Sequence, residues 1–152
     1  MRLQTCRRHP NAAPFMATCS GCAQELYDIE QANRARAAAN RARAEAELSA
    51  KVRTALGLPG YPAPSGDETA RRVSMWSQHE LNDVYEHVGG TVTTRVVERT
   101  GSCSTWQATE ITVTVDLPDV GRVEAVTDWC EEYGGRNLPL MQAIPDAELI
   151  AA

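Results

Sequence analysis

Hydrophobic and polar positions divide the chain into stretches with different patterns. Residues 1–23 hold few apolar side chains and carry a cluster of Cys and His. Residues 24–57 contain no Pro or Gly before Gly57 and are rich in Ala, Arg, Glu and Leu. Because these residue types favour helices, the sequence predicts one long polar helix there. Residues 70–135 combine alternating and helical periodicities, which predicts a compact α+β unit.

The long helix is predicted to end at Gly57, with Pro59 just beyond it, as is typical of a helix C-terminus. The Pro- and Gly-rich residues 58–69 then indicate a linker. Two arrangements would bury the narrow apolar stripe in the second half of the helix. It would seat against the C-terminal unit, or it would pair with a second copy in a homodimer. The stripe consists of Ala44, Leu48, Val52 and Ala55.

The C-terminal unit is predicted to start with a short strand around residues 72–76, followed by a helix. Ser77 and Glu80 form a capping box, in which the serine hydroxyl caps the helix and the glutamate reaches back to its start. Gly89 and Gly90 end the helix. Its apolar face consists of Leu81, Val84, Tyr85 and Val88.

A β-hairpin is predicted next. Residues 91–100 are rich in Thr and Val, which favour strands. Residues 106–116 place Ile111, Val113 and Val115 on one face, and residues 101–104 form the turn between the two strands.

The last predicted element is a second amphipathic helix, ended by a pair of glycines at 134 and 135, with a loosely held tail over residues 136–152. Its apolar positions are Val123, Val126, Cys130 and Tyr133. The expected fold is therefore α+β, with an N-terminal stub, a long polar helix, and a small antiparallel sheet covered by two helices.

Composition and charge narrow the class of protein. Among 152 residues, 43% are hydrophobic and 23% charged, which is typical of a soluble globular protein. No apolar run approaches the roughly 18–20 residues that span a bilayer, and no secretory signal is visible, so we expect a cytoplasmic protein. Residues 1–53 carry nine Arg or Lys and five Asp or Glu, whereas residues 54–152 carry six and fifteen. Two interpretations of this asymmetry stay open. The basic front half contacts nucleic acid or an acidic partner, or the charge is uneven without any functional role.

Four residues near the N-terminus have the spacing of a zinc site. Cys6 and His9 form one pair, and Cys19 and Cys22 form a second pair after nine intervening residues. Each x2 spacing makes a tight turn that aims two ligands at one point, and thiolate and imidazole suit Zn²⁺. Four protein ligands would close the site, so a structural metal is expected. Free thiols with a surface histidine, or an iron–sulfur site, are the alternatives.

The segment Cys6-Arg7-Arg8-His9-Pro10, with Cys19-Ser20-Gly21-Cys22 and a following helix, resembles the short zinc-ribbon or B-box-like stubs of actinobacterial and actinophage proteins. The resemblance covers roughly the first 30 residues, and the second ligand set of a full B-box is absent. It implies a recognition or scaffolding role and an origin in a phage or mobile element.

Arginines in the basic half are candidates for phosphate contact. Arg34 and Arg41 share one side of the predicted helix, while Arg36 and Arg43 lie roughly opposite, so the helix has no single basic face. A solvated helix is the alternative. The residues retained as candidate nucleic-acid contacts are Arg7, Arg8, Arg34 and Arg41.

Other reactive residues give weaker signals. Cys103 in the hairpin turn would need His79 or His87 in hydrogen-bond contact to act as a nucleophile. Cys130 is expected in the core, the three tryptophans are expected to pack, and the acidic residues at 128, 131 and 132 are expected to be solvated. No phosphate-binding loop, dinucleotide fingerprint or catalytic triad is present in the sequence.

These observations favour a non-enzymatic, zinc-stabilised interaction or adaptor protein with one bound Zn²⁺ and a protein partner. The alternative is a zinc-containing nucleic-acid-binding regulator that uses the basic stub and helix. An enzyme is not expected, because no set of catalytic groups is recognisable.

Overall fold

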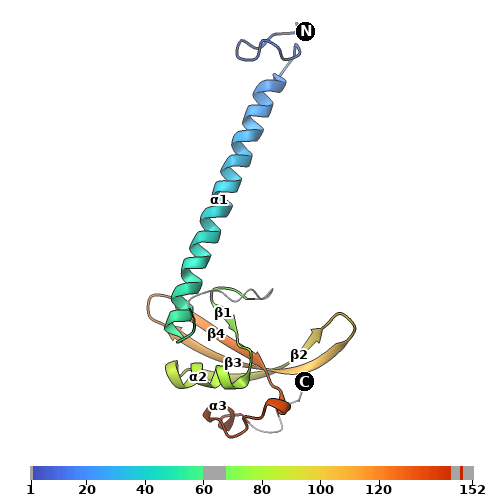
Figure 1. Ribbon diagram of the computed structural model, residues 1–152. Coiled ribbons are helices and arrows are strands. Elements are labelled where there is room, and N and C mark those ends of the chain that lie inside the picture. The colour runs from blue at the N-terminus through green and yellow to red at the C-terminus, as the bar shows by residue number, and fades with distance from the viewer. Residues whose placement is uncertain (1, 60–67, 145–147, 149–152) are drawn as a thin grey trace. The chain divides into compact units, whose positions relative to one another are not determined.

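The computed structural model describes residues 2–59, 68–144 and 148 of the chain. They fall into two compact units, residues 1–44 and residues 45–152. The elements in chain order are α1 (Ser20–Ala55), β1 (Arg72–Ser74), α2 (Gln78–Val88), β2 (Thr91–Thr100), β3 (Thr105–Leu117), β4 (Gly121–Asp128), the 3₁₀ turn η1 (Glu131–Tyr133) and α3 (Pro139–Gln142) (Figure 1). The α+β class predicted from the sequence is confirmed.

Helix α1 confirms the long polar helix, with ends that differ from those predicted. It starts at Ser20 rather than Gln24, because the Cys19 carbonyl accepts a hydrogen bond from the Ala23 N–H at 2.9 Å. It stops at Ala55, two residues before the predicted end.

The C-terminus of α1 is a Schellman motif. Gly57 has φ 78°, a left-handed conformation that glycine adopts without strain. Its N–H donates to the Thr54 carbonyl at 3.1 Å, and the Leu58 N–H donates to the Arg53 carbonyl at 2.8 Å. The predicted linker that follows lies mostly outside the described residues, since residues 60–67 are not described.

Three of the four residues in the apolar stripe of α1 pack against the C-terminal unit, which is one of the two expected arrangements. Val52 is fully buried in the core of the second unit, and Leu48 and Ala55 pack against that core. Ala44 is exposed. The last turns of the helix therefore complete the hydrophobic core of residues 45–152.

Four strands form one mixed sheet in the order β1-β4-β3-β2. The β2–β3 hairpin confirms the prediction, with Val92 opposite Val113 in an antiparallel register. β4 continues antiparallel to β3, whereas β1 runs parallel to β4 with Val73 opposite Ala125. The expectation of a purely antiparallel sheet is wrong, because β1 pairs with the free edge of β4 and runs in the same direction as that strand.

The predicted helix over residues 123–133 is also wrong, since residues 121–128 form strand β4. Val123, Ala125 and Thr127 are buried on one side of this strand, whereas Val126, which a helix would place beside Val123, lies on the other side. The unpaired edge of β3 gives this β-branched segment a partner, which local periodicity does not reveal.

The segment after Gly135 is not a loose tail over residues 138–144. Leu140 is fully buried in the core, and Met141 and Ile144 are nearly so. The Leu140 N–H donates to Asn82 Oδ1 at 3.0 Å, which ties this segment to α2. Helices α2 and α3 lie together on one face of the sheet, where the core forms (Figure 1). The predicted tail beyond residue 144 lies outside the described residues except for Glu148.

The capping box of α2 is present with one change of partner. Ser77 Oγ accepts from the Glu80 N–H at 3.4 Å, as predicted. Glu80 Oε2 reaches back to the N–H of Trp76 at 2.8 Å, rather than to that of Ser77. Gly89, with φ 70°, ends the helix at the predicted position.

Candidate metal centre

The stub folds into a closed loop that brings the two predicted ligand pairs together. Gln4 and Phe15 exchange two backbone hydrogen bonds of 2.8 and 3.0 Å across the loop. Cys19 directly precedes α1, and Cys22 lies in the first turn of the helix. Cys19 and Cys22 therefore lie at the start of a helix, and Cys6 and His9 lie in a loop closed by the backbone bonds between Gln4 and Phe15.

The four candidate ligand atoms have the spacing of a tetrahedral metal site. The three thiol sulfurs and His9 Nδ1 all lie within 4.8 Å of one another. His9 Nδ1 lies 3.5 Å from the sulfur of Cys6, 3.5 Å from that of Cys22 and 3.8 Å from that of Cys19. Cys6 Sγ and Cys22 Sγ lie 3.6 Å apart. Zn–S and Zn–N bonds of about 2.3 and 2.0 Å at tetrahedral angles would separate the ligands by about 3.5–3.8 Å, so all four residues are placed to hold one metal ion.

The close packing of the cluster shifts the pKa values of two of its thiols in opposite directions. The hydrogen bond with His9 lowers the pKa of the Cys6 thiol to about 6. The hydrogen bond with Cys6, together with burial and the neighbouring thiols, raises the pKa of Cys22 to about 11. Three thiolates at this spacing repel one another, so a divalent cation would favour their joint ionisation.

Gly21 gives the imidazole of His9 its space. A Cβ atom at this position would lie 2.5 Å from His9 Cγ and 2.8 Å from Cδ2. The backbone there is helical, so the glycine serves close approach rather than an unusual dihedral angle. The contact with His9 therefore accounts for a glycine between Cys19 and Cys22.

Sequence reasoning missed Glu25, which contacts the candidate ligand His9. Glu25 Oε1 lies 2.5 Å from His9 Nε2, and Glu25 Oε2 lies 2.8 Å from Arg8 Nη2. The hydrogen bond with Cys6, and after it the contact with Glu25, raises the pKa of His9 above its ordinary value. The signal in the sequence is the position of Glu25 three residues after Cys22, on the same side of a helix.

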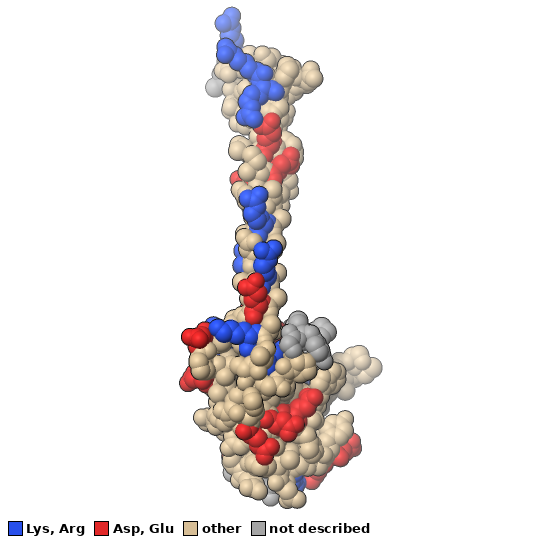
Figure 2. All heavy atoms as spheres, turned by 60° about the vertical axis from the view of Figure 1, so that its left-hand side comes forward, with Lys and Arg blue, Asp and Glu red and all other residues tan. Residues whose placement is uncertain are grey.

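The candidate nucleic-acid contacts are all exposed, but they are not equivalent. Arg8 is engaged in the ion pair with Glu25, whereas Arg7, Arg34 and Arg41 form no ion pair with any described residue. Figure 2 shows Lys and Arg side chains on the stub, both basic and acidic side chains along the helix, and several Asp and Glu side chains on the visible face of the α+β unit.

The other reactive residues do not form a catalytic arrangement among the described residues. Cys103 is exposed in the hairpin turn, where its sulfur lies 3.7 Å from the hydroxyl of Ser102. Cys130 is half-buried after β4, and not on a helical face, so its predicted environment is wrong. Of the three tryptophans, only Trp129 packs fully; Trp106 is 42% and Trp76 86% exposed.

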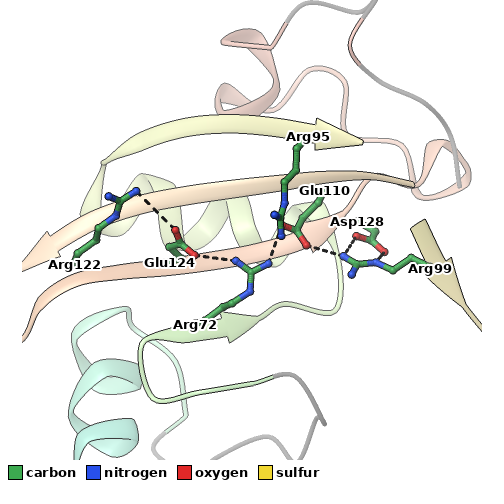
Figure 3. A network of polar contacts seen from close by, with 7 residues as sticks. All are labelled: Arg72, Arg95, Arg99, Glu110, Arg122, Glu124 and Asp128. Carbon is green, nitrogen blue, oxygen red and sulfur yellow. Dashed lines mark hydrogen bonds and ion pairs between the residues drawn. The ribbon is translucent and has the colours of Figure 1, made fainter. Parts of the chain in front are cut away.

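The open face of the sheet carries a network of ion pairs that the sequence did not reveal (Figure 3). Glu110, only 1% exposed, accepts hydrogen bonds from Arg72 and Arg95 at 2.8 Å and from Arg99 at 2.7 Å. Arg99 also pairs with Asp128 at 2.8 Å, so this acidic residue is not simply solvated as predicted. The network joins all four strands on the face opposite the helices.

Comparison with protein-family models, with curated proteins and with solved structures finds no match to this chain. Within the described residues, none of the helices combines the length and the apolar character that crossing a membrane requires.

Proposed function

We propose that this protein is a non-enzymatic, zinc-stabilised interaction protein of the adaptor type. The observation that carries the proposal is the closed donor set of Cys6, His9, Cys19 and Cys22, whose ligand atoms lie within 4.8 Å of one another. Zn²⁺ held by these four groups would have no coordination position left for a substrate, so its contribution is to the fold of the stub. The stub has little apolar interior of its own, which makes it dependent on the metal.

Exposed apolar side chains support a protein partner. Leu3 and Met16 on the stub, with Leu26, Tyr27 and Ile29 on α1, are each more than half exposed. In the other unit, Trp76 and Tyr133 border a cavity of about 440 Å³ that is also lined by arginines. Trp, Tyr and Arg are the residue types that contribute most to binding at protein interfaces.

The alternative function is a zinc-containing nucleic-acid-binding regulator. It is favoured by the seven arginines and three acidic residues of positions 1–44, and by the absence of ion pairs for Arg7, Arg34 and Arg41 within the described part of the chain. It is weakened by the engagement of Arg8 with Glu25 and by the spread of the helical arginines around the axis.

Three further points belong to the same proposal. We place the protein in the cytoplasm, where thiols stay reduced and available to zinc. We assign its origin to a phage or mobile element, and the resemblance of the stub motif supports this assignment. If the chain forms a homodimer, we propose that the exposed part of α1 makes the contact. Three residues of the apolar stripe are packed in the core of their own chain and cannot serve this purpose.

Two measurements on the purified full chain test the function. Elemental analysis should find one zinc per chain, and loss of this zinc in Cys19→Ser, with retention in Cys103→Ser, would assign it to the stub. Affinity capture from the native host should then recover a protein that binds the wild type and fails to bind either Cys19→Ser or Trp76→Ser. Retention on a DNA or RNA column that falls steeply with salt, and is lost in Arg34→Gln/Arg41→Gln, would instead support the regulator.

A further inference from the structure

The imidazole of His9 is held from both sides. Its Nδ1 atom faces the three sulfurs at 3.5–3.8 Å, and its Nε2 atom lies 2.5 Å from Glu25 Oε1. The two ring nitrogens therefore have different partners: soft metal-binding atoms on one side and a carboxylate on the other.

We propose that Glu25 is the positioning residue of the metal centre and that it makes Nδ1 the nitrogen of His9 that binds zinc. A neutral imidazole carries one N–H, and a carboxylate oxygen only accepts hydrogen bonds. The proton is therefore held on Nε2, which leaves the lone pair of Nδ1 directed at the sulfurs and raises its basicity. This inference rests on the proposed zinc function of the stub.

The placement of Glu25 follows from the helix that also carries a ligand. Glu25 is three residues after Cys22 on α1, so the two side chains leave the same side of the helix. A regular helix holds both at a fixed separation, whereas His9 and Cys6 come from the loop. Glu25 thus connects the loop ligand His9 to the element that carries Cys22.

Arg8 completes the arrangement. Its guanidinium lies 2.8 Å from Glu25 Oε2, so each oxygen of the carboxylate has its own partner. Zn²⁺ with three thiolates carries a net charge of −1, and Glu25 would add another negative charge beside it. The positive charge of Arg8 offsets this addition, which explains why an acidic residue is tolerated next to an anionic metal centre.

The test compares zinc affinities of the full chain by chelator competition. Glu25→Ala should bind zinc about 10–100-fold more weakly than the wild type, which is the usual loss when the hydrogen-bond partner of a metal-binding histidine is removed. Glu25→Gln keeps an acceptor oxygen and should fall between the two. Glu30→Ala, which changes an exposed glutamate on the same helix, is the matched control and should bind like the wild type. Arg8→Ala should weaken binding by less than Glu25→Ala does, and Arg7→Ala should have no effect.

A measurement on the wild-type protein tests the tautomer of His9 directly, so its result does not depend on whether any variant folds. In the zinc-bound chain, nitrogen NMR of His9 should show a proton on Nε2 and metal-shifted Nδ1. A proton on Nδ1, or zinc affinity of Glu25→Ala within twofold of the wild type, would overturn the inference while leaving the zinc site intact. Failure of the wild-type chain to bind zinc would overturn the proposed function and this inference together.

Discussion

Gly21 lies so close to the ring of His9 that a single added methyl group would overlap it, at 2.5 Å from Cγ. The nearest atoms belong to the ring itself and to His9 Cβ, which can move only if the ligand moves. We therefore expect Gly21→Ala to displace Nδ1 from the sulfurs and to weaken zinc binding at least tenfold, although alanine favours helices more than glycine does. Competition with a chromophoric chelator measures the change. Ser20→Ala, one residue earlier in the same helix, is the control, and equal affinities for the two variants would contradict the prediction.

Removal of one thiolate should affect the stub and leave the second unit folded. Cys19→Ser should release the metal and loosen the stub, because three ligands bind zinc far more weakly than four. Residues 45–152 contain their own core and should stay folded. Zinc content by elemental analysis reports the first outcome, and the near-ultraviolet circular dichroism of the tryptophans, all three of which lie in residues 45–152, reports the second. A Cys19→Ser protein that retains a full equivalent of zinc would show that the ligand assignment is wrong.

Glu110 should make the second unit sensitive to acid. Burial disfavours ionisation of this carboxyl, but the hydrogen bonds from Arg72, Arg95 and Arg99 outweigh burial and lower its pKa to about 2. The pKa is thus lower in the folded chain than the ordinary 4.5. The resulting stability is fully present above pH 4.5 and is lost as the pH falls towards 2. The depression corresponds to about 3 kcal/mol.

A pH series of denaturant unfolding checks this expectation. The free energy of unfolding of the wild type should decline between pH 4.5 and 2, and Glu110→Gln should show a smaller decline from a lower starting value. Glu98→Gln, which alters an exposed carboxylate on β2, should keep the decline of the wild type. A parallel decline in Glu110→Gln and wild type would mean that other groups cause the acid sensitivity.

Leu140 should be as important to stability as a residue of the central strands. It is fully buried in the core, in a segment that the sequence pattern assigned to a tail. We expect Leu140→Ala to reduce the free energy of unfolding by about 2–5 kcal/mol, the range for a buried leucine. Val96→Ala, at a position that is 52% exposed, should cost far less. Chemical denaturation followed by tryptophan fluorescence compares them, and similar midpoints for Leu140→Ala and wild type would argue against the packed position.

Local chemistry accounts for the parts of this fold that the sequence predicts well. The capping box at Ser77, the glycines after α2, and the Thr- and Val-rich hairpin each depend on residues close together in the chain. The candidate metal ligands were recognisable for a similar reason, because each pair has an x2 spacing. Gly57 likewise ends α1 through contacts within a few residues.

The parts that sequence reasoning missed depend on partners far apart in the chain. Val123 and Val126 have the spacing of a helix face, yet their segment pairs with the edge of β3, and that partner is not visible in the local sequence. Leu140 is buried in a core of residues far from it in the chain, and its N–H donates to Asn82, 58 positions earlier. Glu25 is one acidic residue among several on α1. Its spacing from Cys22 places it on the side of that candidate ligand, but its contact with His9 depends on how the loop folds.

The parallel pairing of β1 with β4 has a consequence for the order in which this unit assembles on the ribosome. Arg72 and its register partner Glu124 are 52 residues apart, so the first strand leaves the exit tunnel long before its neighbour exists. The β2–β3–β4 meander can form from adjacent segments, whereas β1 has to wait for it. The strand that is synthesised first therefore cannot enter the sheet before β4 exists, and a nascent chain that ends before β4 would leave β1 without its partner.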